Sequence, residues 1–259
     1  SSGNSYNGTF NGCTAVYLHN YENVAGKSLN FDGTDDYISI SNPSQDLSSS
    51  ITISLWINPS SVSAWSTLIE KGYDKEFELM LSQHGKIKFY NGNGNISTDP
   101  NYETDIVIPV NKWSHVCVVR NSTISKINIY VNSKNLPYTS TYGNYQSTIG
   151  SSTNPIYIGK RENISGNPNI YPGQMADVRI YNRALTSAEV FNIYSPSNLI
   201  TQGVITGTDK KLPVVHYKFD KDIDYKSVSD SVPTDNLVVW LKFDNNNTDT
   251  QSNTVTEYG

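Results

Sequence analysis

The nine residues Ile51-Thr-Ile-Ser-Leu-Trp-Ile-Asn-Pro59 place an aliphatic side chain at every second position, Ile51, Ile53, Leu55 and Ile57. Successive side chains of a β-strand point to opposite sides, so this alternation predicts a strand with one face in a core. The same pattern recurs between clusters of Gly, Asn, Ser and Pro, in residues 77–81, 127–131 and 174–181. These segments indicate short antiparallel strands, each with one buried face.

Two of the segments carry more specific expectations. The run Trp113-Ser-His-Val-Cys-Val-Val119 is largely apolar on both faces and is therefore expected at the centre of a sheet. In residues 174–181, the expected core face holds Ala176, Val178 and Ile180, and the expected solvent face holds Asp177 and Arg179.

One helix signal interrupts the strands. Thr186-Ser-Ala-Glu189 has the spacing of a capping box, in which the Thr and Glu side chains each bind the other residue's backbone N–H. Leu185 and Val190 stand at the flanking hydrophobic positions. The pattern predicts a short helix that ends near Tyr194, because Pro196 prevents its continuation.

Composition excludes several classes of protein. The chain of 259 residues has a net charge of -5, and its Lys and Arg residues form no run, which argues against nucleic acid and anionic lipid as partners. No stretch of apolar residues approaches the length of about 18 that a membrane span requires. The 18 Tyr, 7 Phe and 4 Trp residues predict an aromatic-rich core. Cys13 and Cys117 are too few for a disulfide framework, and Cys117 is expected to be a buried small hydrophobe.

The last sixty residues have a different texture. A polar connector begins after Asn198 and contains the strand-like segment Val214-Val-His-Tyr-Lys-Phe-Asp220; a second, similar segment is Leu237-Val-Val-Trp-Leu-Lys-Phe-Asp244. The chain therefore contains an internal repeat of one strand. We expect a sandwich domain over residues 1–198, a connector over 199–235 with the first repeat at 212–220, and the second repeat within 236–259.

Six motifs in order resemble the laminin-G-like, concanavalin-A-like lectin/glucanase superfamily. They are Lys27-Ser-Leu-Asn-Phe-Asp-Gly-Thr-Asp-Asp-Tyr-Ile38, Ile51 to Pro59, Asn111-Lys-Trp-Ser-His-Val116, Ile127-Asn-Ile-Tyr-Val-Asn132, Pro155-Ile-Tyr-Ile-Gly159, and Gly173 to Leu185 with Glu189-Val190. The resemblance covers residues 2–194. It implies an all-β fold, an antiparallel two-sheet jelly-roll sandwich with one short C-terminal helix, to which this chain adds C-terminal strand segments.

The chain departs from the family at its start. Members begin with a strand resembling Leu-Val-x-Trp-x-x-Phe-Asp, but here Ser2-Gly-Asn-Ser-Tyr-Asn-Gly-Thr9 has no such strand before it, and that strand type occurs twice at the C-terminus. Either a tandem array has been cut out of phase, or a C-terminal strand fills the vacant position beside residues 173–181, within the chain or from a neighbouring copy. An empty position would leave an unpaired edge.

No catalytic residues are assigned. Hydrolytic relatives of this fold carry two carboxylates on one strand, about 5 to 5.5 Å apart for retaining chemistry. Here Glu103-Thr-Asp105 lacks the second Glu, and Glu76 and Glu78 are expected to form a solvated face. The four His residues lack metal-ligand spacing, and His115 is expected to be a core residue.

The resemblance implies a structural calcium ion between the acidic turn after residue 31 and the closing strand, held by Asp32, Gly33 and Asp177. Such a junction offers the carboxylate and carbonyl oxygens that calcium prefers. The alternative is a plain Asp-Gly turn with solvated carboxylates. A second acidic run, Asp220-Lys-Asp222-Ile-Asp224, is not expected to bind calcium because Tyr225 stands where the sharp turn requires Gly.

A glycan site would need exposed aromatic rings beside Asn and Asp side chains. Trp65, Tyr73, Tyr90 and Tyr102 lie in or beside Asn- and Gly-rich segments and are the candidates, with partly buried packing as the alternative for each. Trp56 and Trp113 match framework positions and are expected in the core.

The function expected is that of a non-catalytic binding or structural module, for adhesion or carbohydrate recognition. It would belong to a larger extracellular, cell-surface or virion-surface protein, with a glycan, neighbouring copies or further domains as partners. The main alternative is an assembly or fibre protein linked by strand exchange, without a glycan ligand. A polysaccharide-degrading enzyme is the least favoured reading.

Overall fold

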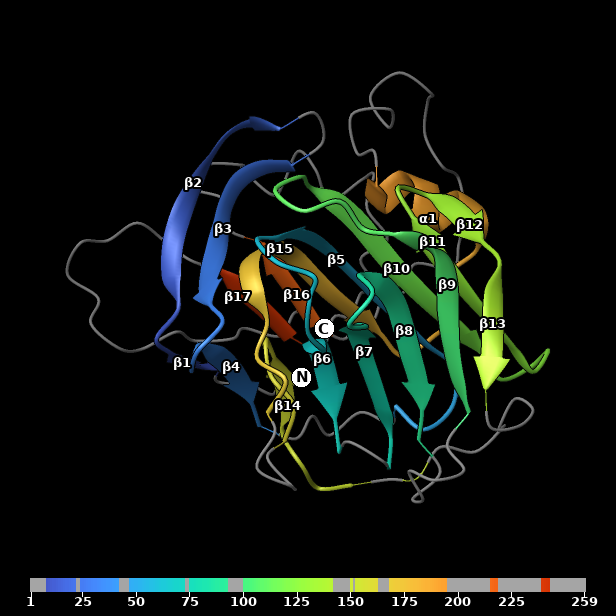
Figure 1. Ribbon diagram of the computed structural model, residues 1–259. Coiled ribbons are helices and arrows are strands. Elements are labelled where there is room, and N and C mark those ends of the chain that lie inside the picture. The colour runs from blue at the N-terminus through green and yellow to red at the C-terminus, as the bar shows by residue number, and fades with distance from the viewer. Residues whose placement is uncertain are drawn as a thin grey trace, which may run out of the picture.

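The structure is a two-sheet sandwich. The computed structural model describes residues 8–21, 24–41, 47–72, 75–92, 100–141, 150, 152–162, 168–194, 215–218 and 239–242 (Figure 1). Sheet A contains eight strands in the spatial order β1 (Gly8–Asn11), β4 (Tyr37–Ile40), β14 (Ile156–Ile158), β6 (Ser66–Lys71), β7 (Phe77–Leu81), β8 (Lys86–Asn91), β9 (Asn101–Val107) and β13 (Tyr138–Thr141).

Sheet B contains nine strands. Its main path runs β12 (Lys134–Leu136), β11 (Lys126–Val131), β10 (Ser114–Asn121), β5 (Ile51–Pro59), β15 (Pro172–Tyr181), β16 (Val215–Lys218) and β17 (Val239–Lys242). The hairpin of β2 (Thr14–Tyr21) and β3 (Val24–Asp32) joins it where β3 pairs with β15. Among the strands that the structure describes, all pairings are antiparallel except that of β16 with β17. The all-β sandwich with one short helix is therefore confirmed.

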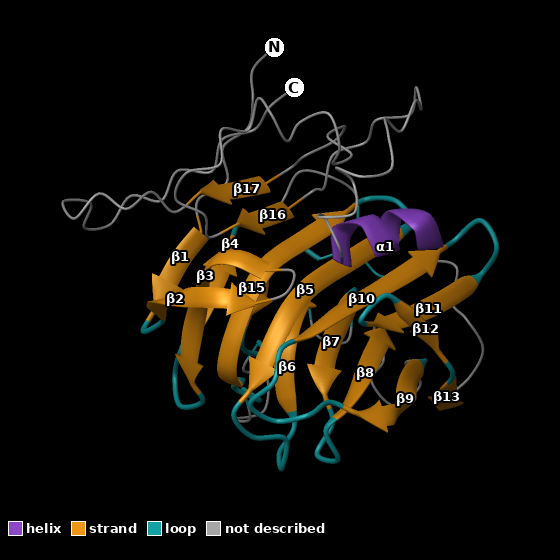
Figure 2. Ribbon diagram, turned by 90° about the horizontal axis from the view of Figure 1, so that it is seen from above, coloured by secondary structure: helices purple, strands orange, loops and turns teal. Residues whose placement is uncertain are grey.

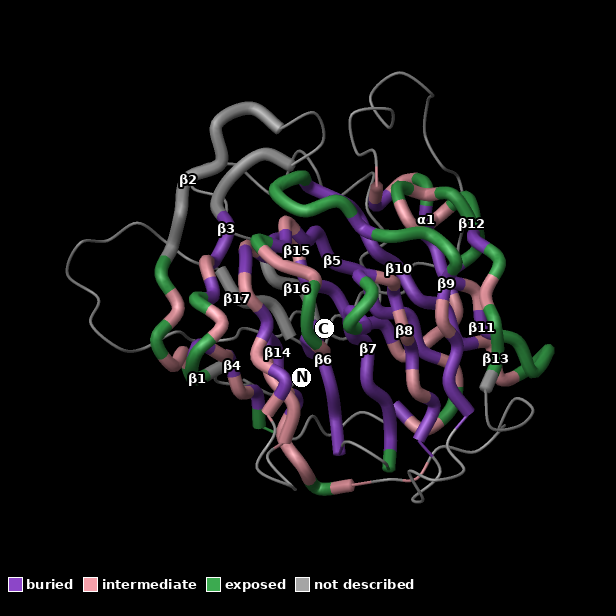
Figure 3. Tube along the Cα trace, in the orientation of Figure 1, coloured by how far each residue is buried: buried purple, intermediate pink, exposed green. Residues whose placement is uncertain are grey.

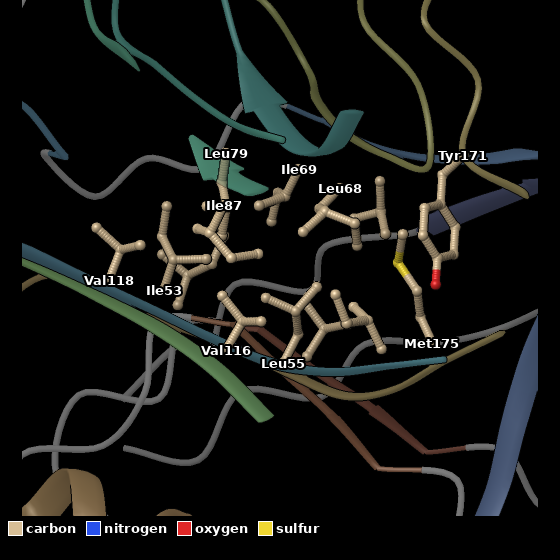
Figure 4. Close-up of a cluster of buried hydrophobic side chains, with 14 of the residues drawn as sticks. Ile53, Leu55, Leu68, Ile69, Leu79, Ile87, Val116, Val118, Tyr171 and Met175 are labelled. Atoms are coloured by element: carbon tan, nitrogen blue, oxygen red, sulfur yellow. The ribbon is translucent and has the colours of Figure 1, made fainter. Parts of the chain in front are cut away.

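The core lies between the two sheets. Alternate residues of β5 and β10 point toward alternate residues of β7 and β8 and toward the consecutive residues Leu68 and Ile69 of β6, where the register of β6 shifts (Figure 4). The side chains that meet there are fully buried: Ile53, Leu55, Val116, Val118, Leu68, Ile69, Leu79 and Ile87. Strand β10 lies between β5 and β11 with residues 114–120 buried on both faces, which confirms the central strand that its sequence predicts. Trp56 and Trp113 are also buried, as expected.

Strand β15 corrects one expectation. Its register against β5 shifts between Ala176 and Arg179, and Asp177 adopts a left-handed backbone conformation with φ of 48°. Such a bulge re-aims the following side chains. Arg179 is consequently buried rather than solvated, and its guanidinium donates two hydrogen bonds, of 2.9 and 2.7 Å, to the carboxylate of Asp177.

The single described helix, α1 (Ser187–Tyr194), covers the outer face of sheet B. Its capping box is formed as predicted: the backbone N–H of Thr186 donates to Glu189 Oε2 at 2.8 Å, and that of Glu189 donates to Thr186 Oγ1 at 3.2 Å. Figure 2 shows α1 beside β5, β10 and β11 on the side away from sheet A. Val190 and Ile193 of α1 pack on a cluster that includes Cys117. Cys117 is thus the buried, unbridged residue that the sequence predicts.

His115 lies in the same outer layer of sheet B. Its Nε2 is 2.8 Å from Ser54 Oγ, and its ring lies 5.3 Å from that of Trp56 and 5.7 Å from that of Tyr194. This burial lowers the pKa of His115 to about 3, because a charged imidazolium would lose its hydration there. The expected role as a core residue is confirmed.

The buried imidazole makes stability depend on pH. The unfolded chain takes up a proton near pH 6.5, whereas folded His115 stays neutral until pH 3 is approached, so its contribution is fully present above pH 6.5 and is lost as pH falls. We expect the free energy of unfolding to drop by about 2 kcal/mol from this group between pH 7 and pH 5. Urea unfolding at both pH values measures it. His115→Gln should remove this slope, whereas His84→Gln, at an exposed position, should retain it; equal slopes in all three proteins would contradict the prediction.

Candidate functional site

Sheet A turns a polar and aromatic face away from the core. In β7 and β8, the residues Phe77, Leu79, Leu81, Ile87 and Phe89 point inward, so that Glu78, Met80, Lys88 and Tyr90 lie on the outer side. Figure 1 shows β6, β7, β8 and β9 side by side in front of sheet B, and Figure 3 shows buried and half-buried residues alternating along β8. The one described helix lies on the other sheet, so this outer face is the candidate site.

One row of side chains crosses four strands of this face. Tyr157 in β14 is opposite Glu70 in β6, Glu70 is opposite Glu78 in β7, and Glu78 is opposite Tyr90 in β8. Directly opposite residues of neighbouring strands share a face, so the row reads aromatic, acidic, acidic, aromatic.

The end of the row at Tyr90 is built around Lys88. Its Nζ lies 5.1 Å from the ring centroid of Trp65 and 5.1 Å from that of Tyr90, and 3.8 Å from Glu103 Oε2. These four residues, the Trp65 cluster, are all half-buried. Cation–π attraction holds an ammonium within about 6 Å of an aromatic face. The cluster thus offers aromatic surface, a donor and an acceptor in one place.

The other end of the row has a similar construction. Lys160 Nζ lies 3.5 Å from the ring centroid of Tyr37 and 4.6 Å from that of Tyr157, and the two rings meet edge to face at 6.0 Å. Burial raises the pKa of Tyr157, and the carboxylates of Glu162 and Glu70 raise it further. Lys160, Tyr37 and Tyr157 form the Tyr37 cluster, in which the phenol of Tyr157 stays protonated and able to donate a hydrogen bond.

The two central carboxylates are held by a loop that follows β14. Arg161 Nε lies 3.4 Å from Glu78 Oε1, to which the Thr67 hydroxyl also donates, and the backbone N–H of Glu162 donates to Glu70 Oε1 at 3.0 Å. Burial raises the pKa of Glu78, and Arg161 and Thr67 oppose that rise. Both carboxylates are fully covered, so the loop and Thr67, and not solvent, satisfy their hydrogen-bonding capacity.

These contacts correct the expected solvated face of Glu76 and Glu78. Glu76 is 2% and Glu78 is 1% exposed. Glu76 forms a buried ion pair with Lys71 and accepts hydrogen bonds from the backbone N–H and the hydroxyl of Ser152, at 2.6 and 2.8 Å. The partners, Arg161 and Ser152, come from segments more than seventy residues away in sequence, so alternation within one strand could not reveal them.

The four aromatic residues that the sequence suggests for a glycan site do not all lie on the outer face of sheet A. Trp65 and Tyr90 are brought together on the outer face of sheet A. Tyr102 is a correction: it is 3% exposed, belongs to the core and packs edge-on against Tyr138 at 5.2 Å, which removes it from the candidate set. Tyr73 lies outside the described residues. Lys88, Lys160 and Tyr37 were not identified from the sequence, because only the strand register shows which rings they meet.

The acidic turn forms without Asp177. Carboxylate oxygens of Asp32, Asp35 and Asp36 lie within 4.8 Å of one another, and Asp32 Oδ1 accepts a hydrogen bond of 2.7 Å from the backbone N–H of Thr34. Asp32 is opposite Pro172, five positions before Asp177 in β15, and Asp177 instead binds Arg179. The structure therefore does not bring Asp32 and Asp177 together, and calcium at the turn stays a prediction.

A two-sheet antiparallel sandwich of this kind has the jelly-roll architecture. The family model of the concanavalin A-like lectin/glucanases superfamily matches residues 32–191, more than half of the chain, and the chain belongs to this superfamily. No curated protein sequence matches the chain. No helix in the described part of the chain is long and apolar enough to cross a membrane.

Several solved structures share the fold. A protein assigned as carbohydrate-binding from Bacteroides ovatus has a TM-score of 0.54 at 18% identity, over 83% of this chain and 52% of its own. Domain 4 of an extracellular arabinanase from Geobacillus stearothermophilus, in complex with arabinotriose, has a TM-score of 0.53 at 18% identity, over 73% and 88%. The receptor binding domain of botulinum neurotoxin mosaic serotype C/D has a TM-score of 0.54 at 17% identity, over 77% and 48%. The chain thus spans about half the length of the Bacteroides protein.

Proposed function

We propose that this chain is a non-catalytic carbohydrate-binding module that receives its ligand on the outer face of sheet A. The observation that carries the proposal is the Trp65 cluster, in which two aromatic rings, an ammonium and a carboxylate lie side by side and half-exposed. A sugar ring has apolar C–H faces and a rim of hydroxyls. Aromatic rings pack against the C–H faces, and charged side chains bind the hydroxyls. Small-ligand sites combine apolar and polar groups in this way.

The fixed scaffold beneath the cluster favours binding. The ammonium of Lys88 contacts two rings and the carboxylate of Glu103, and these contacts restrict its conformations before a ligand arrives. Binding groups that are already ordered lower the entropic cost of association. The sharing of this fold with a protein assigned as carbohydrate-binding and with a domain in complex with arabinotriose supports the same reading.

The absence of catalysis is part of the proposal. Glu70 and Glu78 face each other on neighbouring strands, but both are buried. Glu70 accepts a hydrogen bond from the backbone N–H of Glu162, and Glu78 accepts one from Thr67 and is paired with Arg161. A general acid must reach the glycosidic oxygen, and a nucleophile must reach the anomeric carbon. These two buried carboxylates instead stabilise sheet A and the loop that crosses it.

Substitution of Trp65 tests the proposal. Glycan-array screening of the parent protein, with arabinotriose and soluble β-glucans included, supplies the ligand, and isothermal titration measures its affinity. We expect Trp65→Ala to weaken binding by about 30-fold, the loss of roughly 2 kcal/mol that follows truncation of a central aromatic contact.

The matched control is Phe191→Ala. Phe191 is 42% exposed but lies on α1, on the opposite sheet, so its removal should leave affinity unchanged. No binding of the parent to any glycan, or equal affinities for Trp65→Ala and the parent, would refute the proposal. Release of reducing sugar by the parent that is lost in Glu78→Gln would refute the non-catalytic assignment.

The wider setting is also proposed. A sugar-binding face suits adhesion by a larger extracellular, cell-surface or virion-surface protein, in which this domain would be one module. Structural calcium at the turn of Asp32, Asp35 and Asp36 would stabilise the C-terminal end of β3.

A further inference from the structure

Strand β15 pairs with one strand along one edge and with two strands along the other. Along its first edge β15 pairs with β5 from Gly173 to Tyr181. Along its second edge, β3 pairs only with residues 172–175, and β16 pairs at Arg179 and Ile180. Ile180 and Tyr181 are fully buried, and buried backbone polar groups need hydrogen-bond partners. The C-terminal half of β15 therefore requires a strand that the hairpin of β2 and β3 does not supply.

The strand that lies there is one of two near-copies. Residues 214–220 read Val-Val-His-Tyr-Lys-Phe-Asp and residues 238–244 read Val-Val-Trp-Leu-Lys-Phe-Asp, so five of the seven positions are identical. The structure pairs the two copies in parallel and in matching register, with Val215 opposite Val239 and Lys218 opposite Lys242. Figure 2 shows β16 and β17 side by side at the same end of sheet B.

Matching register makes the two copies equivalent toward β15. Parallel neighbours run in the same direction, so β17 would present the same backbone groups to β15 after a shift of one strand spacing, about 4.8 Å. We infer that the edge of β15 at residues 179–180 is a strand-acceptor site for this repeated sequence, which either copy can fill. Where neither copy of its own chain occupies it, the same edge accepts the repeat of a second copy of this chain, because main-chain pairing supplies most of the affinity in strand addition.

Paired proline variants test this equivalence. Tyr217→Pro and Leu241→Pro alter corresponding positions of the two strands, and proline removes a backbone donor from a ladder. If the copies substitute for each other, each single variant of the full chain should melt within about 2 °C of the parent, and the double variant should melt roughly 6 to 12 °C lower. A Tyr217→Pro variant that melts as low as the double variant would overturn the inference, because the second copy would then be unable to replace the first.

A peptide distinguishes an acceptor site from a general need for C-terminal sequence. A synthetic peptide of residues 236–245, added in excess to the double variant, should restore most of the lost melting temperature, and a peptide of the same composition in scrambled order should not. A ligand that binds only the folded state raises its stability in this way. Equal effects of the two peptides would overturn the inference.

Discussion

Lys71→Met should lower the free energy of unfolding by about 3 to 5 kcal/mol, the range found when one partner of a buried ion pair is removed. The side chains of Lys71 and Glu76 are only 5% and 3% exposed, and Lys71 also donates to the carbonyl of Ser152 at 3.0 Å. The variant leaves the carboxylate of Glu76 buried without its counter-charge. Urea unfolding at neutral pH, followed by tryptophan fluorescence, measures the loss.

The double variant Lys71→Met/Glu76→Gln is the control. It removes both charges while keeping an amide that can accept the hydrogen bonds of Ser152. We expect it to recover most of the stability that the single variant loses, because the cost comes from the unpaired charge and not from the lost pair. A double variant that is less stable than Lys71→Met would show that the ion pair itself is strongly stabilising.

Gly173→Ala should be comparably destabilising, by about 3 kcal/mol or more. Gly173 has φ of 137°, a conformation that residues with a Cβ rarely adopt, and it lies in β15 between Phe31 and Pro59 of the neighbouring strands. A Cβ there would lie 2.4 Å from the carbonyl oxygen of Asn58 and 2.8 Å from the Cα of Pro59. Both obstacles are backbone atoms, so neither can move without disturbing β5.

Thermal unfolding compares this variant with Gln174→Ala, the next residue of the strand. Gln174 is half-buried and its side chain makes a long contact of 3.4 Å with Asn58, so its removal should cost less than about 1 kcal/mol. Equal melting temperatures for Gly173→Ala and the parent would show that β15 can move away from β5 at this point.

The strand pattern was predictable because it is local. Alternation in β5, β7 and β11 predicts which residues enter the core, and the capping box predicts the start of α1. The bulge in β15 was not predictable in the same way. It depends on the left-handed conformation of Asp177, which no pattern of apolar residues indicates, and it is the reason that Arg179 is buried.

The candidate site was only half predictable. Exposed aromatics near turns are visible in the sequence, and Trp65 and Tyr90 do lie together. Tyr102 could not be separated from them, because Asn101 and Tyr102 occupy opposite faces of β9 and only the sheet decides which face is inner. The contacts of Lys160 and Arg161 depend on where a distant loop crosses sheet A.

The position of β5 at the middle of sheet B determines how late in biosynthesis the sheet can be completed. Strand β5 pairs with β15 as far as Tyr181, so that edge stays open until more than a hundred further residues have left the ribosome. At about 5 to 20 residues per second, the wait lasts roughly 6 to 25 s. Sheet B therefore closes late in synthesis, and for that interval the nascent chain exposes a long aliphatic strand to chaperones and to other nascent copies of itself.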